Sequence, residues 1–362
     1  KNNHCRCFTQ KITKVRGMHD LSPEDYARYH HVVQVSKSTC SLYGYHQIET
    51  PILEHSSLFS RTLGTDTDVV MKEMYSFEDL SGNKLALRPE NTAGVMRAFL
   101  EWRDSTNSSG RYFYEGPMFR YERPQKGRSR QFHQFGVECI GEDHHEADAE
   151  IIEMASHILS KLNINNTKLH LNSLGDSASR QKYKTILTEY LLSQKQKLSQ
   201  HSLQRLDRGN PLRVLDSKDL GDKEVVSKAP LIVDTMAPDS LKRFNAIQNS
   251  LKSLGIPFEV NPHLVRGLDY YSHTVFEFVE DVRDEKGILG ASQGTVLAGG
   301  RYDGLAQLLS EDCGPVPAVG WAAGVERVIA MCPFTPSDPP SVAVIAVWSK
   351  ESRMSQEMVN DH

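Results

Sequence analysis

The stretch FRYERPQKGRSRQFHQFG, Phe119 to Gly136, has strand-forming aromatic residues at both ends and a loop with Pro124 and Gly127 between them. It predicts two strands joined by a loop. This hairpin contains five cationic side chains but only one acidic side chain, Glu122. The cationic residues are Arg120, Arg123, Lys126, Arg128 and Arg130. Planar guanidinium groups form bidentate hydrogen bonds to phosphate oxygens, so the excess favours a triphosphate-binding site. A solvated basic hairpin is the alternative, and this segment alone does not decide between them.

Further strand and helix patterns flank the hairpin. The short strand candidates are 74–77, 84–87, 111–114, 118–123 and 134–140, and consecutive short strands indicate an antiparallel sheet. Ser22 followed by Pro23 marks a helix start, and apolar residues at helical spacing carry this helix to Gly44. A second helix, 145–162, has the apolar spacing of a helix packed on the sheet. These patterns predict an α+β fold, an antiparallel sheet flanked by helices.

The amino-acid composition of the sequence changes after residue 175. Residues 177–230 are rich in Lys, Gln, Ser and Asp and carry few strand signals, which predicts a mainly helical insertion. A helix is predicted at 239–254, and strands are predicted at 257–261, 273–279 and 295–298. Residues 320–331 are predicted to form a strand that leads into a helix. Four prolines between 333 and 340 mark a linker. We therefore expect a core in two parts, 1–175 and 241–332, a helical insertion domain, 176–240, and a terminal segment, 333–362.

The composition excludes several classes of protein. With 42 Lys and Arg against 46 Asp and Glu, the net charge of −4 indicates no general affinity for nucleic acid, so any such surface must be local. Six scattered cysteines fit a reducing compartment better than a disulfide framework. No apolar run approaches the roughly 20 residues of a membrane span. Residues 1–19 contain no acid, which is typical of an organellar transit remnant and also of a trimmed chain.

Four more segments hold residues suited to binding a ligand. Glu90 and Thr92, in LRPENT, lie where a strand ends and a helix opens, although the segment also reads as a capped turn. RGLDYY, 266–271, combines a cation, a carboxylate and two phenols, although strand tyrosines are commonly packing residues. In AGGRYDG, 298–304, the glycines predict a close approach of the backbone. Arg327 lies on an otherwise apolar helix, so we expect a carboxylate or phosphate partner for its charge.

Five segments, in order, resemble those of a known family. YGYHQIETPILE (43–54), FRYE (119–122) and GVER (324–327) are similar to motifs 1, 2 and 3 of class II aminoacyl-tRNA synthetases. LVRGLDYYSHTVFEF (264–278) and LAGGRYDGL (297–305) resemble the two signature stretches of histidyl-tRNA synthetases. The resemblance extends from about residue 16 to residue 331. In its general sequence character the chain is most similar to the bacterial or organellar branch of the family. It implies the class II synthetase fold for the predicted sheet.

The resemblance implies a site for two substrates. The residues implied for ATP are Arg120, Glu122, Arg128, Phe132 and Arg327, with Mg²⁺ bound mainly through the phosphates and no metal site in the protein. The residues implied for histidine are Glu90, Thr92, Arg120, Gln134, Glu138, Arg266, Tyr270 and Tyr271. Glu138 and Tyr271 would hydrogen-bond the imidazole nitrogens, so that other amino acids leave buried polar groups unpaired. Arg266 and Arg120 are the implied catalytic residues, because they would stabilise charge at the α-phosphate.

The implied activity is ATP-dependent formation of histidyl-adenylate and transfer of the histidyl group to the 3′ end of tRNA-His. The implied protein is a homodimer without a membrane segment, in the cytoplasm or in a mitochondrial or plastid matrix. Asn91 stands where the family often has glycine, and we expect it to be tolerated because Asn also accepts unusual backbone angles.

The end of the chain departs further from the family pattern. Family members continue past the linker into an anticodon-binding domain, so we expect 333–362 to hold the start of a truncated domain of that kind. This favours a non-catalytic paralogue, such as the regulatory subunit of ATP phosphoribosyltransferase or a sensor of uncharged tRNA. The retained site residues favour the ligase.

Overall fold

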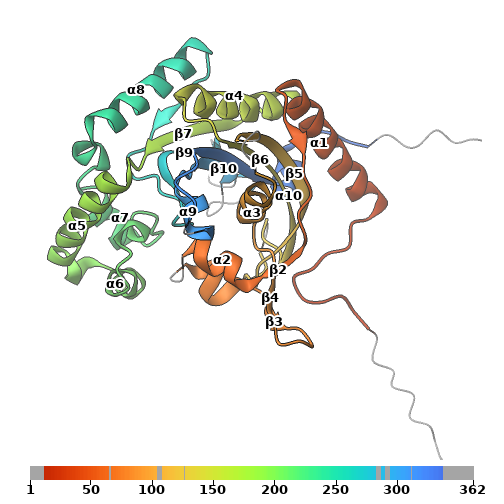
Figure 1. Cartoon of the computed structure of the whole chain (residues 1–362), viewed down its shortest axis with the longest axis horizontal. Helices are drawn as coiled ribbons and strands as arrows, with labels where there is room; N and C mark the ends of the chain where they lie inside the picture. Colours follow the sequence, from red (N-terminus) through yellow and green to blue (C-terminus); the bar gives the residue numbers. More distant parts are fainter. Residues whose placement is uncertain are drawn as a thin grey trace, which may run out of the picture.

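An eight-stranded sheet in the order β1-β5-β6-β11-β10-β9-β7-β8 forms the centre of the protein (Figure 1). The computed structural model describes residues 12–64, 67–103, 108–125, 127–282, 287–289, 294–310 and 312–336. All pairs from β5 to β7 are antiparallel, whereas the edge strands β1 and β8 pair in parallel. The strands are β1 (His46–Gln47), β5 (Gly110–Phe119), β6 (Gln131–Ile140), β7 (Thr167–Ser173), β8 (Glu259–Val260), β9 (Ser272–Glu280), β10 (Thr295–Arg301) and β11 (Ala318–Gly324). This antiparallel sheet with its flanking helices confirms the predicted fold class.

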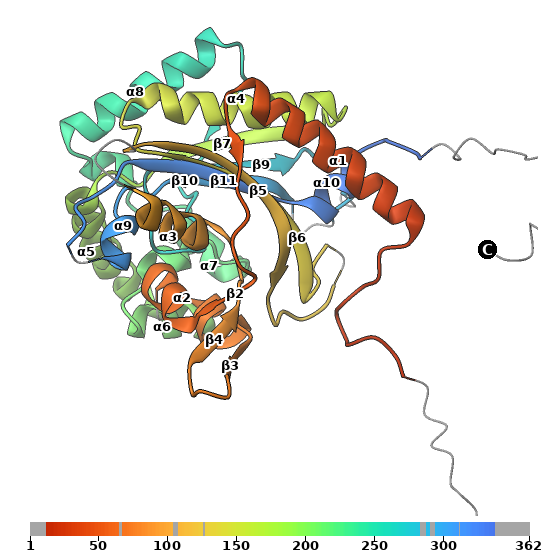
Figure 2. The same ribbon diagram turned by 45° about the vertical axis from the view of Figure 1, so that its right-hand side comes forward.

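Helices pack against both faces of the sheet, each with its own hydrophobic core (Figure 2). One face carries α1 (Pro23–Leu42), α4 (His145–Lys161), α8 (Pro238–Ser253) and α10 (Val325–Met331). The other carries α2 (Ser56–Leu63), α3 (Thr92–Trp102), α9 (Leu305–Leu309) and the small sheet of β2 (Leu53–His55), β4 (Lys84–Leu87) and β3 (Ser76–Glu78). A π-helical turn, Val69–Glu73, follows α2.

Alternation along β6 places its side chains in two environments. Phe135, Val137 and Cys139 belong to the core beneath α4, because successive strand residues point to opposite faces. Gln134 and Glu138 therefore share the other face, with Gly136 between them. A Cβ on Gly136 would lie 2.3 Å from the Tyr114 hydroxyl, so this glycine leaves room for the tyrosine ring. The strand thus presents two polar side chains on one face and core residues on the other.

The predicted helix start is confirmed, and the predicted break in β5 is wrong. The Ser22 side chain accepts a hydrogen bond from the Asp25 backbone N–H, and Pro23 is the first residue of α1. The sequence predicted separate strands at 111–114 and 118–123, but β5 is continuous. Gly116 and Pro117, taken by themselves, have the local character of a turn. In the sheet, however, β1 pairs with β5 only at Tyr112 and Phe113. The edge of β5 that faces β1 therefore has no strand partner at Pro117, and the N–H group that proline lacks is not needed there.

Two glycines, Gly299 and Gly300, bring β9, β10 and β11 close together, as the sequence predicted for the AGGRYDG segment. A Cβ on Gly299 would lie 2.1 Å from the Gly320 carbonyl oxygen, and a Cβ on Gly300 would lie 2.4 Å from the Thr274 carbonyl oxygen. Side chains there would force the strands apart. The two glycines therefore permit the close approach of the three strands.

The chain between β7 and β8 is helical, as predicted. It contains α5 (Ser177–Ser193), α6 (Gln200–Asp207), α7 (Leu220–Val226), α8 and three 3₁₀ turns, Lys195–Lys197, Pro211–Val214 and Ile232–Thr235. The assignment of 176–240 as a separate domain stays a prediction. The first eleven residues and the end of the chain after residue 336 lie outside the described residues, so the transit-remnant and truncated-domain predictions are not addressed. Among the helices described, none has the length and apolarity needed to cross a membrane.

Candidate active site

A cavity of about 320 Å³ lies against β6, β10 and β11. Every predicted site residue except Glu138 lines it: Glu90, Thr92, Arg120, Glu122, Arg128, Phe132, Gln134, Arg266, Tyr270, Tyr271 and Arg327. Lys126, which the sequence placed in the same cation cluster, lies outside the described residues. The order of the strands thus brings together residues that are far apart in the sequence.

One end of the cavity is rich in arginine. Arg120 follows β5, and its Nε donates a hydrogen bond to the Pro89 carbonyl at 2.8 Å. Its guanidinium carbon lies 5.4 Å from the centre of the Phe132 ring, within the range of a cation–π contact. Arg128 forms an ion pair with Glu122, with 2.7 Å between Nη1 and Oε2. The Phe132 ring and two guanidinium groups therefore form a surface suited to a planar base and its phosphates.

Arg327 reaches the same end of the cavity from α10. Its Nη1 donates to the Thr295 carbonyl at 2.8 Å, and its Nε donates to the Gly127 carbonyl at 3.2 Å. Burial and the neighbouring Arg128 lower the pKa of Arg327. Both effects disfavour its charged form, so an anion bound here would relieve an existing electrostatic cost.

A histidine–glutamate pair fixes the two elements that carry this end. Glu326 Oε1 accepts from the His133 backbone N–H at 2.9 Å and contacts His133 Nδ1 at 2.8 Å. The pair joins β6 to α10, and its members directly neighbour Phe132 and Arg327 in the sequence. The sequence analysis missed both residues, because the contact spans 193 positions.

The other end of the cavity is built over Glu138, which is 1% exposed. Its carboxyl accepts hydrogen bonds from Thr92 Oγ1 at 2.6 Å and from the Tyr302 hydroxyl. Burial raises the pKa of Glu138 to about 8, and hydrogen bonds from Thr92 and Tyr302 offset only part of that effect. Tyr302 was missed as a site residue, although the segment AGGRYDG that contains it had been singled out.

Glu90 combines a place in the cavity wall with a structural role. Its carboxylate oxygens accept from the backbone N–H groups of Thr92, at 2.8 Å, and Ala93, at 3.1 Å, in the first turn of α3. Burial raises its pKa. Asn91 has an ordinary φ of −120°, and its side chain accepts from Thr50 Oγ1 at 2.5 Å. Pairing with Thr50, and not unusual backbone angles, therefore accommodates Asn91.

Arg266 lines the cavity and pairs with a carboxylate behind it, Glu277 of β9. Its Nη1 lies 3.1 Å from Glu277 Oε2, which also accepts from Thr295 Oγ1 at 3.0 Å. Within the described part of the chain, Arg266 Nε and Gln134 Oε1 are buried atoms without a hydrogen-bond partner. Buried polar atoms are ordinarily paired, so both atoms are available to a polar ligand in the cavity.

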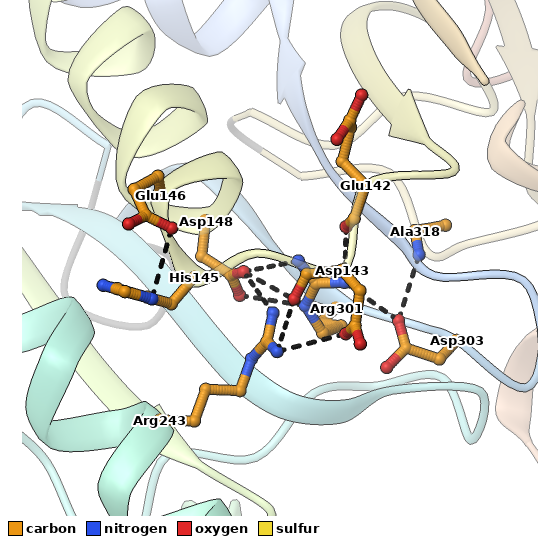
Figure 3. A network of polar contacts seen from close by, with 9 residues as sticks. All are labelled: Glu142, Asp143, His145, Glu146, Asp148, Arg243, Arg301, Asp303 and Ala318. Atoms are coloured by element: carbon orange, nitrogen blue, oxygen red, sulfur yellow. Dashed lines mark hydrogen bonds and ion pairs between the residues drawn. The ribbon is translucent and has the colours of Figure 1, made fainter.

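A buried ion network supports the strand end that carries Tyr302 (Figure 3). Arg301 is 0% exposed, and its Nε and Nη2 bind Asp148 at the start of α4. Its Nη1 donates to Asp303 Oδ1 at 3.1 Å, and the same oxygen accepts from the Ala318 backbone N–H at 3.0 Å. Arg243 of α8 adds a second cation 3.1 Å from Asp148 Oδ2. The network thus joins α4, α8, β10 and β11 at one point.

Comparison with known proteins assigns the chain to a family. Residues 17–328 match the sequence pattern of the family described as histidyl-tRNA synthetase. The chain belongs to the histidyl-tRNA synthetase family. A relative named histidine–tRNA ligase in Rhodospirillum rubrum is 51% identical over 318 residues, covering 88% of this chain and 74% of that protein. One of the same name in Gluconacetobacter diazotrophicus is 49% identical, covering 92% of this chain and 78% of that protein.

A solved member of the histidyl-tRNA synthetase family has the same architecture. The apo histidyl-tRNA synthetase of S. aureus is 33% identical, with a TM-score of 0.70, and the match covers 89% of this chain and 73% of that one. The predicted synthetase resemblance is therefore confirmed, and the described sheet with its flanking helices is the sheet of this family.

Proposed function

We propose that the protein is a histidine–tRNA ligase, which forms histidyl-adenylate from L-histidine and ATP and transfers the histidyl group to the 3′ end of tRNA-His. One observation carries the proposal: a single cavity has an arginine-rich end beside a buried, hydrogen-bonded carboxyl, Glu138. The names of relatives that are 46–51% identical favour a catalytic protein over a regulatory paralogue.

ATP would occupy the arginine-rich end. Phe132 and Arg327 would hold the adenine ring between them, and Glu122 would accept from its amino group. Arg128 and Arg327 would hold the β- and γ-phosphates, and Arg120 would hold the α-phosphate. In the structure Glu122 pairs with Arg128, so binding would exchange this ion pair for contacts with ATP.

Mg²⁺ would arrive with ATP as its phosphate complex. Within the described residues, no group of three or more His, Cys, Asp or Glu side chains is placed to hold a metal ion. The arginines would share the phosphate charge with the ion.

Histidine would occupy the end above Glu138. Glu90, Thr92 and Gln134 would take its α-amino group, and Gln134 Oε1 is one of the unpaired buried atoms. Glu138 and Tyr271 would bind the two imidazole nitrogens, beside the ring of Tyr270, which lies 4.6 Å from that of Tyr271. An amino acid without these nitrogens would form neither of these two hydrogen bonds in the buried end of the cavity, which is the basis of discrimination.

Catalysis would come from position and charge. A carboxylate oxygen of histidine attacks the α-phosphorus, the bond to the bridging oxygen breaks, and pyrophosphate leaves. Arg266 and Arg120 would stabilise the charge that develops on the α-phosphate oxygens. In the second step the ribose hydroxyl of the tRNA end attacks the histidyl carbonyl carbon, and AMP leaves.

Histidine-dependent exchange of labelled pyrophosphate into ATP tests the proposal. We expect exchange with histidine and none with other amino acids. Folded protein that gives no exchange would refute the ligase assignment. Lys228→Ala is the control, because Lys228 forms an exposed pair with Glu224 away from the cavity. This control should retain full exchange.

Assembly as a homodimer is part of the proposal. The motif 1 segment leaves Ile52 and Leu53 exposed at 41% each, and the preceding helix α1 leaves Tyr26 exposed at 55% and Leu42 at 78%. Contiguous exposed apolar groups commonly mark protein interfaces. Sedimentation velocity would give twice the monomer mass, and a monomer at micromolar concentration would contradict the proposal.

A further inference from the structure

Two arginines of the helical segment between β7 and β8 hold the backbone of the loop that carries Arg266 and Tyr271. Arg180 lies in the first turn of α5, and its Nη1 donates to the Asp269 carbonyl at 3.2 Å and to the Tyr271 carbonyl. Arg213 lies in the 3₁₀ turn Pro211–Val214, and its Nη2 donates to the Gly267 carbonyl. The three accepting carbonyl groups belong to every second residue from 267 to 271, so both arginines bind the same short stretch of backbone.

The loop has few other anchors. In the described part of the chain, residues 265–271 lie between the Leu264–Asn261 backbone hydrogen bond and strand β9, and their only regular structure is a single turn at residues 269–270. On its other side the loop abuts the end of α2, because a Cβ on Gly64 would lie 2.4 Å from Asp269 Oδ2. The arginine bonds therefore supply the hydrogen bonding that a strand or helix would otherwise provide.

The boundary between the helical segment and the loop is not closely packed. A small cavity of about 30 Å³ lies there, and its walls include Arg180, Arg213, Arg266, Asp269 and Tyr271. Tyr270 and Tyr271 belong to the hydrophobic core, so the arginine bonds act on the loop backbone on the side that faces this small cavity. Burial lowers the pKa of Arg180, so its charge is retained at a cost that the loop carbonyls offset.

We propose that Arg180 and Arg213 are positioning residues for histidine activation, acting through the backbone of residues 267–271. They hold Arg266 toward the α-phosphate and Tyr271 toward the imidazole. The helical segment then takes part in adenylate formation before any tRNA is bound. This inference rests on the proposed function, because it assigns the two arginines to that reaction.

The test compares Arg180→Ala, Arg213→Ala and the two Arg→Lys variants in pyrophosphate exchange without tRNA. A charged donor to a carbonyl is worth enough that its loss should lower kcat/KM for histidine by about tenfold or more. KM for ATP should change less than kcat/KM for histidine, because the loop would contact ATP only through Arg266, at the α-phosphate. Lysine should restore part of the loss at either position. Lys228→Ala, at an exposed pair with Glu224 in the same helical segment, should behave as wild type.

Hydrogen–deuterium exchange of residues 264–271 supplies a readout independent of catalysis. Both alanine variants should exchange faster in this peptide, while peptides of α4 and β6 stay unchanged. Wild-type kinetics and wild-type loop exchange in both variants would overturn the inference, and so would equal losses for histidine and ATP without lysine rescue. If the wild-type protein itself gives no histidine-dependent exchange, the proposed function fails instead, and the loop measurement still tests the positioning.

Discussion

Replacement of Glu138 by glutamine should stabilise the protein at neutral and alkaline pH and leave it unchanged near pH 4.5. Burial raises the pKa of Glu138 to about 8, against a usual value of 4.5. The folded protein then keeps this carboxyl protonated at pH 7, whereas the unfolded chain does not. Glutamine resembles the protonated acid, because each has one acceptor oxygen and one donor group, but glutamine cannot ionise. The hydroxyl of Thr92 or Tyr302 that faces the donor would rotate to accept from it.

The sign and the size of this change in the free energy of unfolding follow from proton linkage. The pKa is raised on folding, so the stability that the proton contributes is fully present below pH 4.5 and is lost as the pH rises to 8. The loss is about 1.4 kcal/mol per pH unit, which amounts to about 4 kcal/mol at pH 7.5. The glutamine variant should be more stable than wild type by about this amount at pH 7.5.

Urea unfolding at pH 5.0, 6.0 and 7.5 measures the difference in free energy of unfolding between the two proteins. Glu101→Gln, at an exposed pair with Arg97 on α3, is the control and should show no such trend. A difference between Glu138→Gln and wild type that stays constant across the three pH values would refute the reasoning, since Glu138 would then be ionised in the fold.

Three further perturbations have defined outcomes. Arg301→Met should lower the free energy of unfolding by about 3–5 kcal/mol in urea titrations, because it leaves Asp148 with a weaker counter-charge in the core; a loss under 1 kcal/mol would contradict this. Gly320→Ala would place a Cβ 1.8 Å from Glu138 Oε2, so we expect KM for histidine to rise at least about tenfold with KM for ATP nearly unchanged. Glu326→Gln should raise KM for ATP several-fold and spare histidine, since it weakens the contact with His133; the opposite pattern would exclude that role.

Local patterns predicted those features of the fold that depend on neighbouring residues. The Ser22 cap, the helix α4 and the glycine approach between β10 and β11 all follow from short-range rules, and the structure confirms them. The boundaries of β5 were wrong because Gly116 and Pro117 have local turn character that the surrounding sheet overrides. A single sequence does not reveal which side of a strand has a free edge.

The sequence predicted some residues of the site and missed others, for a similar reason. Residues on recognisable motifs, such as Arg120 and Arg266, line the cavity as expected. Tyr302 was missed because it meets Glu138 across 164 positions of sequence, and Glu277 was missed because strand periodicity alone does not show which cation a buried carboxylate will face. The roles of the cavity residues in binding remain predictions that the proposed experiments test.

The place of β11 in the sheet has a consequence for synthesis of the chain on the ribosome. β11 lies between β6 and β10 and pairs with both, yet among the described strands of this sheet it comes last in the sequence. Until residues 318–324 emerge, β6 and β10 each have an open edge that can pair with another nascent chain. Completion of the sheet and closure of the cavity therefore coincide in a single late event, and chaperones that shield strand edges would act before it.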